Sequence, residues 1–172
     1  LISFKCAKKA MLCSINHINK TEIKNLKDCE DRILAKDIFS EINVPEFDNS
    51  AVDGFGFINS NEIKRELEII GESKPGKPFL KKIKKNQAIK IYTGAYILKD
   101  ITRVNTVCME EDCYSDGKKV RITKKFKTGN NIRIKGEDVK KKQRIFLSGR
   151  KIRSIDLAQL SSIGVKKIKV FK

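Results

Sequence analysis

The stretch of residues 44–57 constrains the fold of this chain more than any other part of the sequence. It carries two aspartates, Asp48 and Asp53, among residues that favour turns. Proline fixes φ and glycine permits positive φ, so the composition predicts an ordered, sharply turning loop. Three aromatic residues can anchor such a loop against a core: Phe47, Phe55 and Phe57. The acidic side chains would then stand on a rigid support, where functional sites tend to lie.

The same residues also fit a purely structural interpretation. Asp48, Asn49 and Ser50 can bond to their own backbone in an Asx-turn, and Asp53 with Gly54 can form a plain turn. The pattern by itself favours this structural interpretation over a functional site.

A strongly basic composition raises the question of nucleic-acid binding. The formal net charge is +17 over 172 residues, a length that suits one domain or two small ones. Lysine supplies 30 of the 38 basic residues, and the lysines are scattered along the chain. Nucleic-acid bases are read or stacked upon mainly by arginine and aromatic side chains. We therefore predict a solvated lysine surface that attracts anionic substrates, and no nucleic-acid partner.

The spacing of the cysteines and the lengths of the apolar runs indicate in which cellular compartment the protein is expected. The five cysteines lack paired C-x-x-C spacing, which predicts reduced cytoplasmic thiols rather than disulfides or a zinc site. No run has the apolar length of a membrane span and no signal peptide is visible, so no membrane partner is expected. Because the sequence starts at Leu1 rather than Met, we expect a fragment. The single histidine, His17, is not expected to be catalytic.

Hydrophobic periodicity predicts the regular elements. A helix is expected over residues 3–15 with Ser3 as its cap, and another over 154–163 with Ser154 as its cap. A helical turn is expected over 28–33. Alternating patterns predict strands at 21–26, 67–70, 88–92, 106–109, 118–123 with an edge at 124–127, and 165–171.

Two further segments carry polar groups suited to anions. Thr93 and Gly94 follow a predicted strand, where a hydroxyl and a backbone N–H can bind an oxyanion or a metal-bound water, although a plain turn explains them equally well. Arg133 offers a guanidinium fork that can clamp an oxyanion, close to Asp138. An Arg133–Asp138 ion pair that stiffens a hairpin is the structural alternative, and both roles can hold together.

The organising stretch closely resembles a known family signature. Residues 45–56 are similar to PxFDNSAMDGYA of the molybdopterin molybdotransferases, the family of MoeA and the gephyrin E domain. Val52 stands in place of Met and Phe55 in place of Tyr. Four other segments resemble family motifs in the same order: 32–37 (GRxLAxD), 71–78 (GxSxxGxP), 91–95 (IxTGA) and 129–139 (GxNxRxxGEDI). Residues 96–103 depart from the family pattern, because they lack its proline-containing turn.

The resemblance implies a β-rich α+β fold. Residues 1–46 with 140–172 would form an N-terminal helix and an extended linker domain. Residues 47–139 would form a mixed-β, barrel-like domain inserted into it. The pterin-binding domain and the C-terminal domain of the family are absent from the sequence. In the family, the active site lies between the pterin-binding domain of one chain and the β-rich domain of another.

The resemblance also implies a reaction and its participants. Family members insert molybdate into adenylylated molybdopterin with Mg²⁺ and release AMP, during molybdenum cofactor biosynthesis. They are cytoplasmic homodimers joined through their N-terminal domains, and the adenylyltransferase of the same pathway is a possible partner. By itself, the fragment is expected to be inactive. A gephyrin-like scaffold and a basic nucleic-acid-binding domain are the alternatives.

The site residues implied by the resemblance are carried over one by one. Asp53 would be a hard oxygen ligand near Mg²⁺ or molybdate, directly or through water. Thr93 and Arg133 would hold anionic oxygens, and Asp138 would orient Arg133 or a metal-bound water. The substrate-binding set is completed by two neighbours on the same segments: Ser50 and Gly94.

Overall fold

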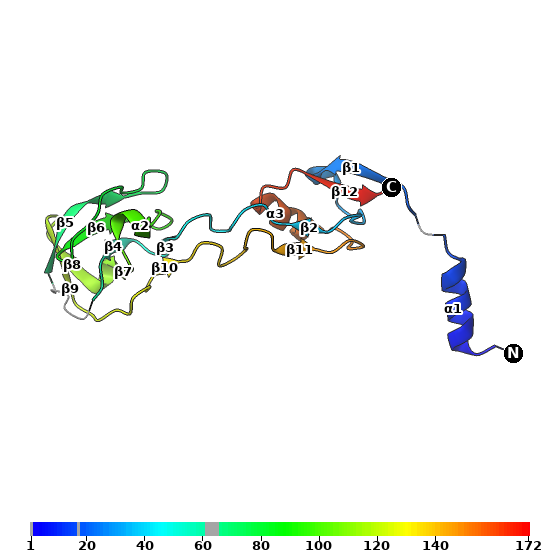
Figure 1. Ribbon diagram of the computed structural model, residues 1–172, viewed down its shortest axis with the longest axis horizontal. Coiled ribbons are helices and arrows are strands. Elements are labelled where there is room, and N and C mark those ends of the chain that lie inside the picture. The colour runs from blue at the N-terminus through cyan, green and yellow to red at the C-terminus, as the bar shows by residue number, and fades with distance from the viewer. Residues whose placement is uncertain (1, 17, 61–65) are drawn as a thin grey trace. The chain divides into compact units, whose positions relative to one another are not determined.

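The computed structural model describes residues 2–16, 18–60 and 66–172. The chain divides into two compact units (Figure 1). The terminal unit consists of the residues up to Ser40 together with Gln143–Lys172. The inserted unit consists of Glu41–Lys142. No helix of the described residues is long and apolar enough to cross a membrane.

The terminal unit is built from two small antiparallel sheets and a helix. Strand β1 (Thr21–Asn25) pairs with β12 (Lys167–Phe171), and β2 (Ile38–Phe39) pairs with β11 (Arg144–Phe146). Helix α3 (Ser154–Ser162) lies against the 3₁₀ turn η1 (Leu26–Asp28). Four fully buried aliphatic side chains form the centre of this unit: Leu34, Ile152, Leu160 and Val170. Segments from both ends of the chain are therefore needed to complete one core.

Helix α1 (Phe4–Ser14) confirms the prediction over residues 3–15. Ser3 caps it by accepting a hydrogen bond from the backbone N–H of Cys6 at 3.3 Å. None of its residues is buried, so Phe4 and Met11 leave their apolar side chains exposed.

Helix α3 confirms the second predicted helix, but its cap differs. Arg153 is the N-cap residue, and Ser154 is the first residue inside the helix. The buried carboxylate of Asp156 accepts the backbone N–H of Arg153 at 3.1 Å and so caps the helix from within. A serine before an apolar run is a cap signal only where its own φ and ψ are extended, and here the extended residue is Arg153.

The inserted unit contains a curled, mixed six-stranded sheet with the order β7-β4-β6-β5-β9-β8. Its strands are β4 (Gly54–Phe57), β5 (Glu66–Ser73), β6 (Gln87–Ile91), β7 (Thr106–Met109), β8 (Cys113–Ser115) and β9 (Lys119–Ile122). Only the β5–β6 pair is parallel. This sheet confirms the predicted β-rich α+β class.

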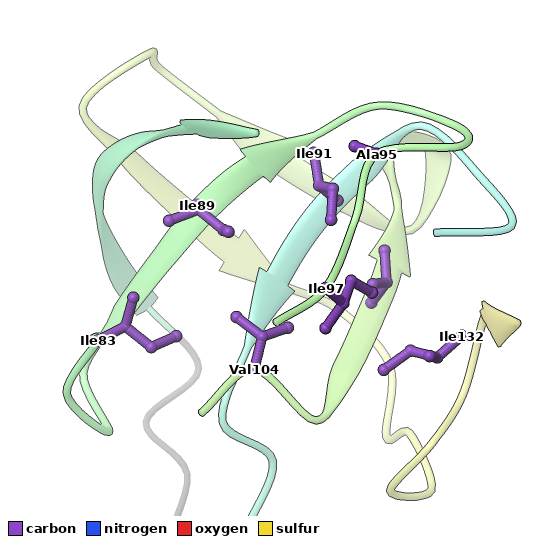
Figure 2. Close-up of a cluster of buried hydrophobic side chains, with 8 residues drawn as sticks. Ile83, Ile89, Ile91, Ala95, Ile97, Val104 and Ile132 are labelled. Atoms are coloured by element: carbon purple, nitrogen blue, oxygen red, sulfur yellow. The ribbon is translucent and has the colours of Figure 1, made fainter. Parts of the chain in front are cut away.

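The two faces of the sheet bury separate apolar clusters. Strand β4 reads Gly-Phe-Gly-Phe, so alternation places Phe55 and Phe57 on one face. They pack with Leu67, Ala88, Cys108, Val120 and Ile122. The other cluster is aliphatic and consists of Ile83, Ile89, Ile91, Ala95, Ile97, Val104, Val107 and Ile132. Figure 2 shows the labelled side chains of this cluster lying together between the strands. Strand β4, between β7 and β6, is therefore buried on both faces.

Short elements complete the inserted unit. Strand β3 (Asn49–Ser50) pairs with β10 (Ile132–Arg133). The signature stretch (residues 44–57) therefore lies beside the segment that carries Arg133 (the arginine segment, residues 132–138). Helix α2 (Lys99–Thr102) and the 3₁₀ turn η2 (Glu110–Asp112) follow β6 and β7 in the chain.

Several local predictions were wrong. The predicted loop is a loop only in part, since residues 54–57 form a buried central strand. Phe47 is 36% exposed and does not anchor the stretch in the core. The predicted helical turn at 28–33 lies earlier, as η1, and residues 124–127 form no strand. Strands β1, β6, β7, β9 and β12 were predicted correctly to within a few residues, whereas α2 and β8 were not predicted.

Candidate functional site

Asp53 and Thr93 meet directly in the inserted unit. The Oδ1 atom of Asp53 accepts a hydrogen bond from the backbone N–H of Thr93 at 2.7 Å and another from its hydroxyl at 2.8 Å. The two segments that carry these residues are also hydrogen-bonded to each other, because Gly94 N donates to the Ser50 carbonyl at 2.8 Å. Asp53 is exposed but held in one orientation, as a ligand-binding carboxylate should be.

These bonds favour the ionised form of Asp53. The backbone and hydroxyl hydrogen bonds from Thr93 lower the pKa of Asp53 below its ordinary value, and the nearby Lys90 ammonium adds to the effect. Only Oδ1 takes part in these bonds, so Oδ2 has no hydrogen-bond partner among the described residues. The site therefore offers one charged oxygen to a ligand at neutral pH.

Ser50 and Gly94 use their polar groups inside the protein. Ser50 is 1% exposed, and its hydroxyl donates to the Val52 carbonyl at 2.6 Å. The N–H of Gly94 is taken by Ser50, and its φ of 79° is the left-handed conformation that favours glycine. In this conformation the two residues hold Asp53 and Thr93 together rather than presenting their own polar groups.

Arg133 lies on the neighbouring segment and is held by two carboxylates. Its Nε donates to Oε1 of Glu137 at 2.5 Å, and its Nη2 donates to Oδ2 of Asp138 at 2.6 Å. The hydrogen bonds to Asp138 and Glu137 raise the pKa of Arg133 above its ordinary value. The predicted Arg133–Asp138 ion pair is confirmed, and Glu137 is a partner that the sequence analysis did not identify.

Asp48 ties the arginine segment to the signature stretch. Its Oδ1 accepts the backbone N–H of Lys135 at 2.7 Å, and its Oδ2 pairs with the Lys99 ammonium at 2.7 Å. Partial burial alone would raise the pKa of Asp48, but the hydrogen bonds from Lys135 and Lys99 outweigh it and lower the pKa. Three separate segments therefore meet at one carboxylate.

The four residues predicted to be catalytic form two hydrogen-bonded pairs. Thr93 with Asp53 is one pair, and Arg133 with Asp138 is the other. The signature stretch contacts both pairs, because it contains Asp53 and because its Asn49 is paired with Arg133 in the β3–β10 ladder. In residues 2–16, 18–60 and 66–172, no group of three or more His, Cys, Asp or Glu side chains could hold a metal ion. A cation at Asp53 would therefore need further oxygen ligands from substrate or water.

The hydrogen bond from the Thr93 hydroxyl predicts that substitution of Thr93 changes the pKa of Asp53 without any ligand bound. Replacing Thr93 with Ala removes one of two donors to Asp53, so we expect the Asp53 pKa to rise toward its ordinary value. Thr93→Ser keeps the hydroxyl and should keep the lowered pKa. NMR titration of the Asp53 carboxyl carbon measures both variants. An unchanged pKa in Thr93→Ala would mean that the backbone N–H alone sets the charge of this carboxylate.

The chain matches the family model described as MoeA N-terminal region (domain I and II) over residues 2–164. It belongs to the MoeA family. Among curated relatives, a molybdopterin molybdenumtransferase from Haemophilus influenzae is 31% identical over 174 residues, covering 100% of this chain and 42% of that protein. The molybdopterin molybdenumtransferase from Bacillus subtilis is 29% identical and is covered over 39% of its length.

A solved structure supports the same assignment. The crystal structure of the molybdopterin biosynthesis MoeA protein from Pyrococcus horikoshii aligns with a TM-score of 0.87 and 33% identity. The alignment covers 99% of this chain and 46% of that one. The chain therefore spans less than half the length of these MoeA relatives and corresponds to the N-terminal region of a MoeA-family molybdopterin biosynthesis protein.

Proposed function

We propose that the protein is a molybdopterin molybdenumtransferase, and that this chain carries one half of its active site. The reaction would insert molybdate into adenylylated molybdopterin and release AMP. The observation that carries the proposal is the Asp53 carboxylate: two hydrogen bonds from Thr93 fix its Oδ1, while its Oδ2 has no hydrogen-bond partner in the part of the chain that the structure describes. The two MoeA-family relatives named above from Haemophilus and Bacillus support the reaction class.

The residues present fit a weakly held Mg²⁺. This ion keeps several waters and is bound by one or two carboxylates together with substrate phosphates. Asp53 supplies one ionised oxygen, and the phosphate of the adenylylated substrate would supply others. When bound, Mg²⁺ would neutralise charge on that phosphate. The absence of a three-ligand cluster among the described side chains agrees with this mode of binding.

We assign the remaining roles by chemistry. Thr93 holds Asp53 in position and keeps it ionised, while Arg133 binds an anionic oxygen of a substrate through a part of its guanidinium that no carboxylate uses. Asp138 binds Nη2 on the adjacent edge of that guanidinium. We assign no covalent step to these groups: they bind and orient the two substrates of the insertion reaction.

The arrangement of the whole protein belongs to the same proposal. The terminal unit and the inserted unit would be the linker domain and the β-rich domain of the family. A cytoplasmic homodimer would place the inserted unit of one chain beside the pterin-binding domain of the other. By this proposal, residues 1–172 would not catalyse insertion by themselves, because they would supply only one half of the active site.

Release of AMP tests the proposed reaction. The full-length protein is mixed with adenylylated molybdopterin and Mg²⁺, and AMP is measured with and without molybdate. We expect AMP release that requires both molybdate and Mg²⁺. A full-length protein that releases no AMP under these conditions, while a MoeA relative does so in parallel, would refute the proposed function.

A further inference from the structure

Glu137 makes two hydrogen bonds that fix both the side chain of Arg133 and the turn after it. Its Oε1 accepts from Arg133 Nε at 2.5 Å, and its Oε2 accepts from the backbone N–H of Ile134 at 2.8 Å. The Glu137 N–H in turn donates to the Ile134 carbonyl at 3.0 Å. Both carboxylate oxygens are therefore committed, one to the guanidinium and one to the backbone that carries it.

The turn that carries Glu137 is anchored on the signature stretch. Gly136 N donates to the Pro45 carbonyl at 2.9 Å, and Asp138 N donates to the Val44 carbonyl at 3.0 Å. Gly136 has a φ of 73°, and a Cβ there would lie 2.9 Å from Asn43 Oδ1. Only glycine fits this position without strain, so the turn has a defined place against residues 43–45. The backbone that carries Glu137 is therefore held in place.

The two carboxylates occupy one edge of the guanidinium. Arginine has five N–H donors in a rigid planar fork, and Nε and Nη2 share one edge of it. Among the described residues, Glu137 binds Nε and Asp138 binds Nη2, so two of the five donors are used and three are left. Two of these three, one on Nη1 and the second N–H of Nη2, share the Nη1–Nη2 edge, and the third points from Nη1 back toward Cδ. The Arg133 side chain is 40% exposed, so an oxyanion can reach this edge.

The contribution of these ion pairs is orientation rather than stability. Exposed pairs contribute little to folding because water competes for both partners. A long, exposed arginine otherwise loses much rotamer entropy when it binds an anion. Two carboxylates that hold the guanidinium in place reduce this entropy loss, since the fork is already oriented before the ligand arrives.

We propose that Glu137 is a positioning residue of the candidate site, which presents the Nη1–Nη2 edge of Arg133 to a tetrahedral oxyanion. The proposal rests on the proposed function for the identity of that oxyanion, which is molybdate or the phosphate of the adenylylated substrate. The sequence places Glu137 within the segment that resembles GxNxRxxGEDI, but this motif does not assign it a partner or a role.

Calorimetric titration of the full-length protein with sodium molybdate, and separately with AMP, tests the proposal. In Glu137→Gln the side chain keeps its size but loses its charge and one of two acceptors. We expect the Kd for one of the two anions to rise about tenfold, as is typical for partners that orient a binding group. The anion that is weakened identifies the source of the oxyanion. Glu66→Gln, which removes the exposed Glu66–Lys119 pair of the same unit, should leave both Kd values unchanged.

A double-mutant comparison separates positioning from a merely structural effect. If Glu137 acts through Arg133, Glu137→Gln should have no further effect on anion binding in an Arg133→Ala background. The inference is overturned if Glu137→Gln binds both anions as the wild type does, if the wild type binds neither anion, or if the two substitutions weaken binding additively. Failure of the proposed function is a different result, namely Glu137-dependent anion binding without molybdate-dependent AMP release.

Discussion

Replacing Gly54 with alanine is expected to unfold the inserted unit under conditions in which the wild type is folded. A Cβ at this position would lie 1.9 Å from the carbonyl oxygen of Cys108 and 2.9 Å from its carbonyl carbon. Both are backbone atoms of β7, the strand that pairs with β4, so neither can move without breaking the ladder. We expect the free energy of unfolding to fall by about 4 kcal/mol or more, a loss that point substitutions rarely reach.

Gly56 provides a matched control on the same strand. A Cβ there would contact the ends of two side chains, Val104 at 3.0 Å and Ile89 at 3.4 Å, and these can shift. Gly56→Ala should therefore cost about 1–3 kcal/mol, as overpacking of a core usually does. All three tyrosines lie in the inserted unit, at positions 92, 96 and 114, so tyrosine fluorescence during urea unfolding reports on this unit. Equal losses for Gly54→Ala and Gly56→Ala would contradict the close approach of β4 and β7.

Removing the Asp156 carboxylate should have the second largest effect, and it should act on the terminal unit. Asp156 is 2% exposed and accepts side-chain hydrogen bonds from Arg150, at 2.8 and 3.1 Å, and from Arg153, both at 3.3 Å. It also caps α3 at its first turn. Asp156→Ala should lower the free energy of unfolding by about 3 kcal/mol, because charge-assisted hydrogen bonds are lost while the partly exposed arginines return to water. Glu22→Ala, which removes a half-exposed pair with Arg32, should cost at most about 1 kcal/mol.

The same carboxylate predicts a dependence on pH. The hydrogen bonds from Arg150, and then those from Arg153, hold the pKa of Asp156 well below its usual range. A depressed pKa in the folded state gives stability that is present above the unfolded value of about 3.9 and is lost as the pH falls below it. The difference in unfolding free energy between wild type and Asp156→Asn should therefore shrink below about pH 4. Hydrogen exchange of the α3 and β12 amides measures it, and a constant difference down to pH 2 would contradict the assignment.

The regular elements followed from the sequence wherever their signal was periodic. Helix α1 and strands β1, β6, β7 and β12 show clear spacing of apolar residues, and each was placed correctly to within a few residues. The buried strand β4 was missed because its glycines were interpreted as turn residues. The close approach of Gly54 to the Cys108 carbonyl gives the physical reason for glycine there, and it involves a residue far away in the sequence.

Residues 71–73 show the same limit. The predicted strand ended at residue 70, but residues 71–73 continue β5, whose pairing with β6 shifts register between Ile69 and Glu72. Gly71 lies at this irregularity, and a Cβ there would meet the Phe79 ring at 2.6 Å. Glycine inside a strand often marks a bulge or a close contact, and local sequence does not distinguish these from a turn.

The contacts of the candidate site followed from the sequence only in part, since the Arg133–Asp138 ion pair was predicted and the Asp53–Thr93 hydrogen bonds were not. The resemblance singled out Asp53, Thr93, Arg133 and Asp138, and the structure places them in two bonded pairs. The same resemblance did not indicate that Ser50 and Gly94 use their polar groups internally, since that depends on how the 50–53 and 93–95 segments pack together. Glu137 lies in the family motif over 129–139, but the motif does not indicate that its carboxylate binds Arg133 Nε and the backbone N–H of Ile134.

The most direct test of the central claim is molybdate insertion by the full-length protein and its Asp53→Asn variant. The variant keeps the size of the side chain and an acceptor for Thr93, but it loses the charged oxygen that a Mg²⁺-bound substrate needs. Molybdenum cofactor formed from adenylylated molybdopterin, molybdate and Mg²⁺ is measured for both proteins, with Glu66→Gln as the control. We predict that insertion is lost in Asp53→Asn and retained in Glu66→Gln. Insertion by Asp53→Asn at the wild-type rate would contradict the account and would move the chemistry away from the signature stretch.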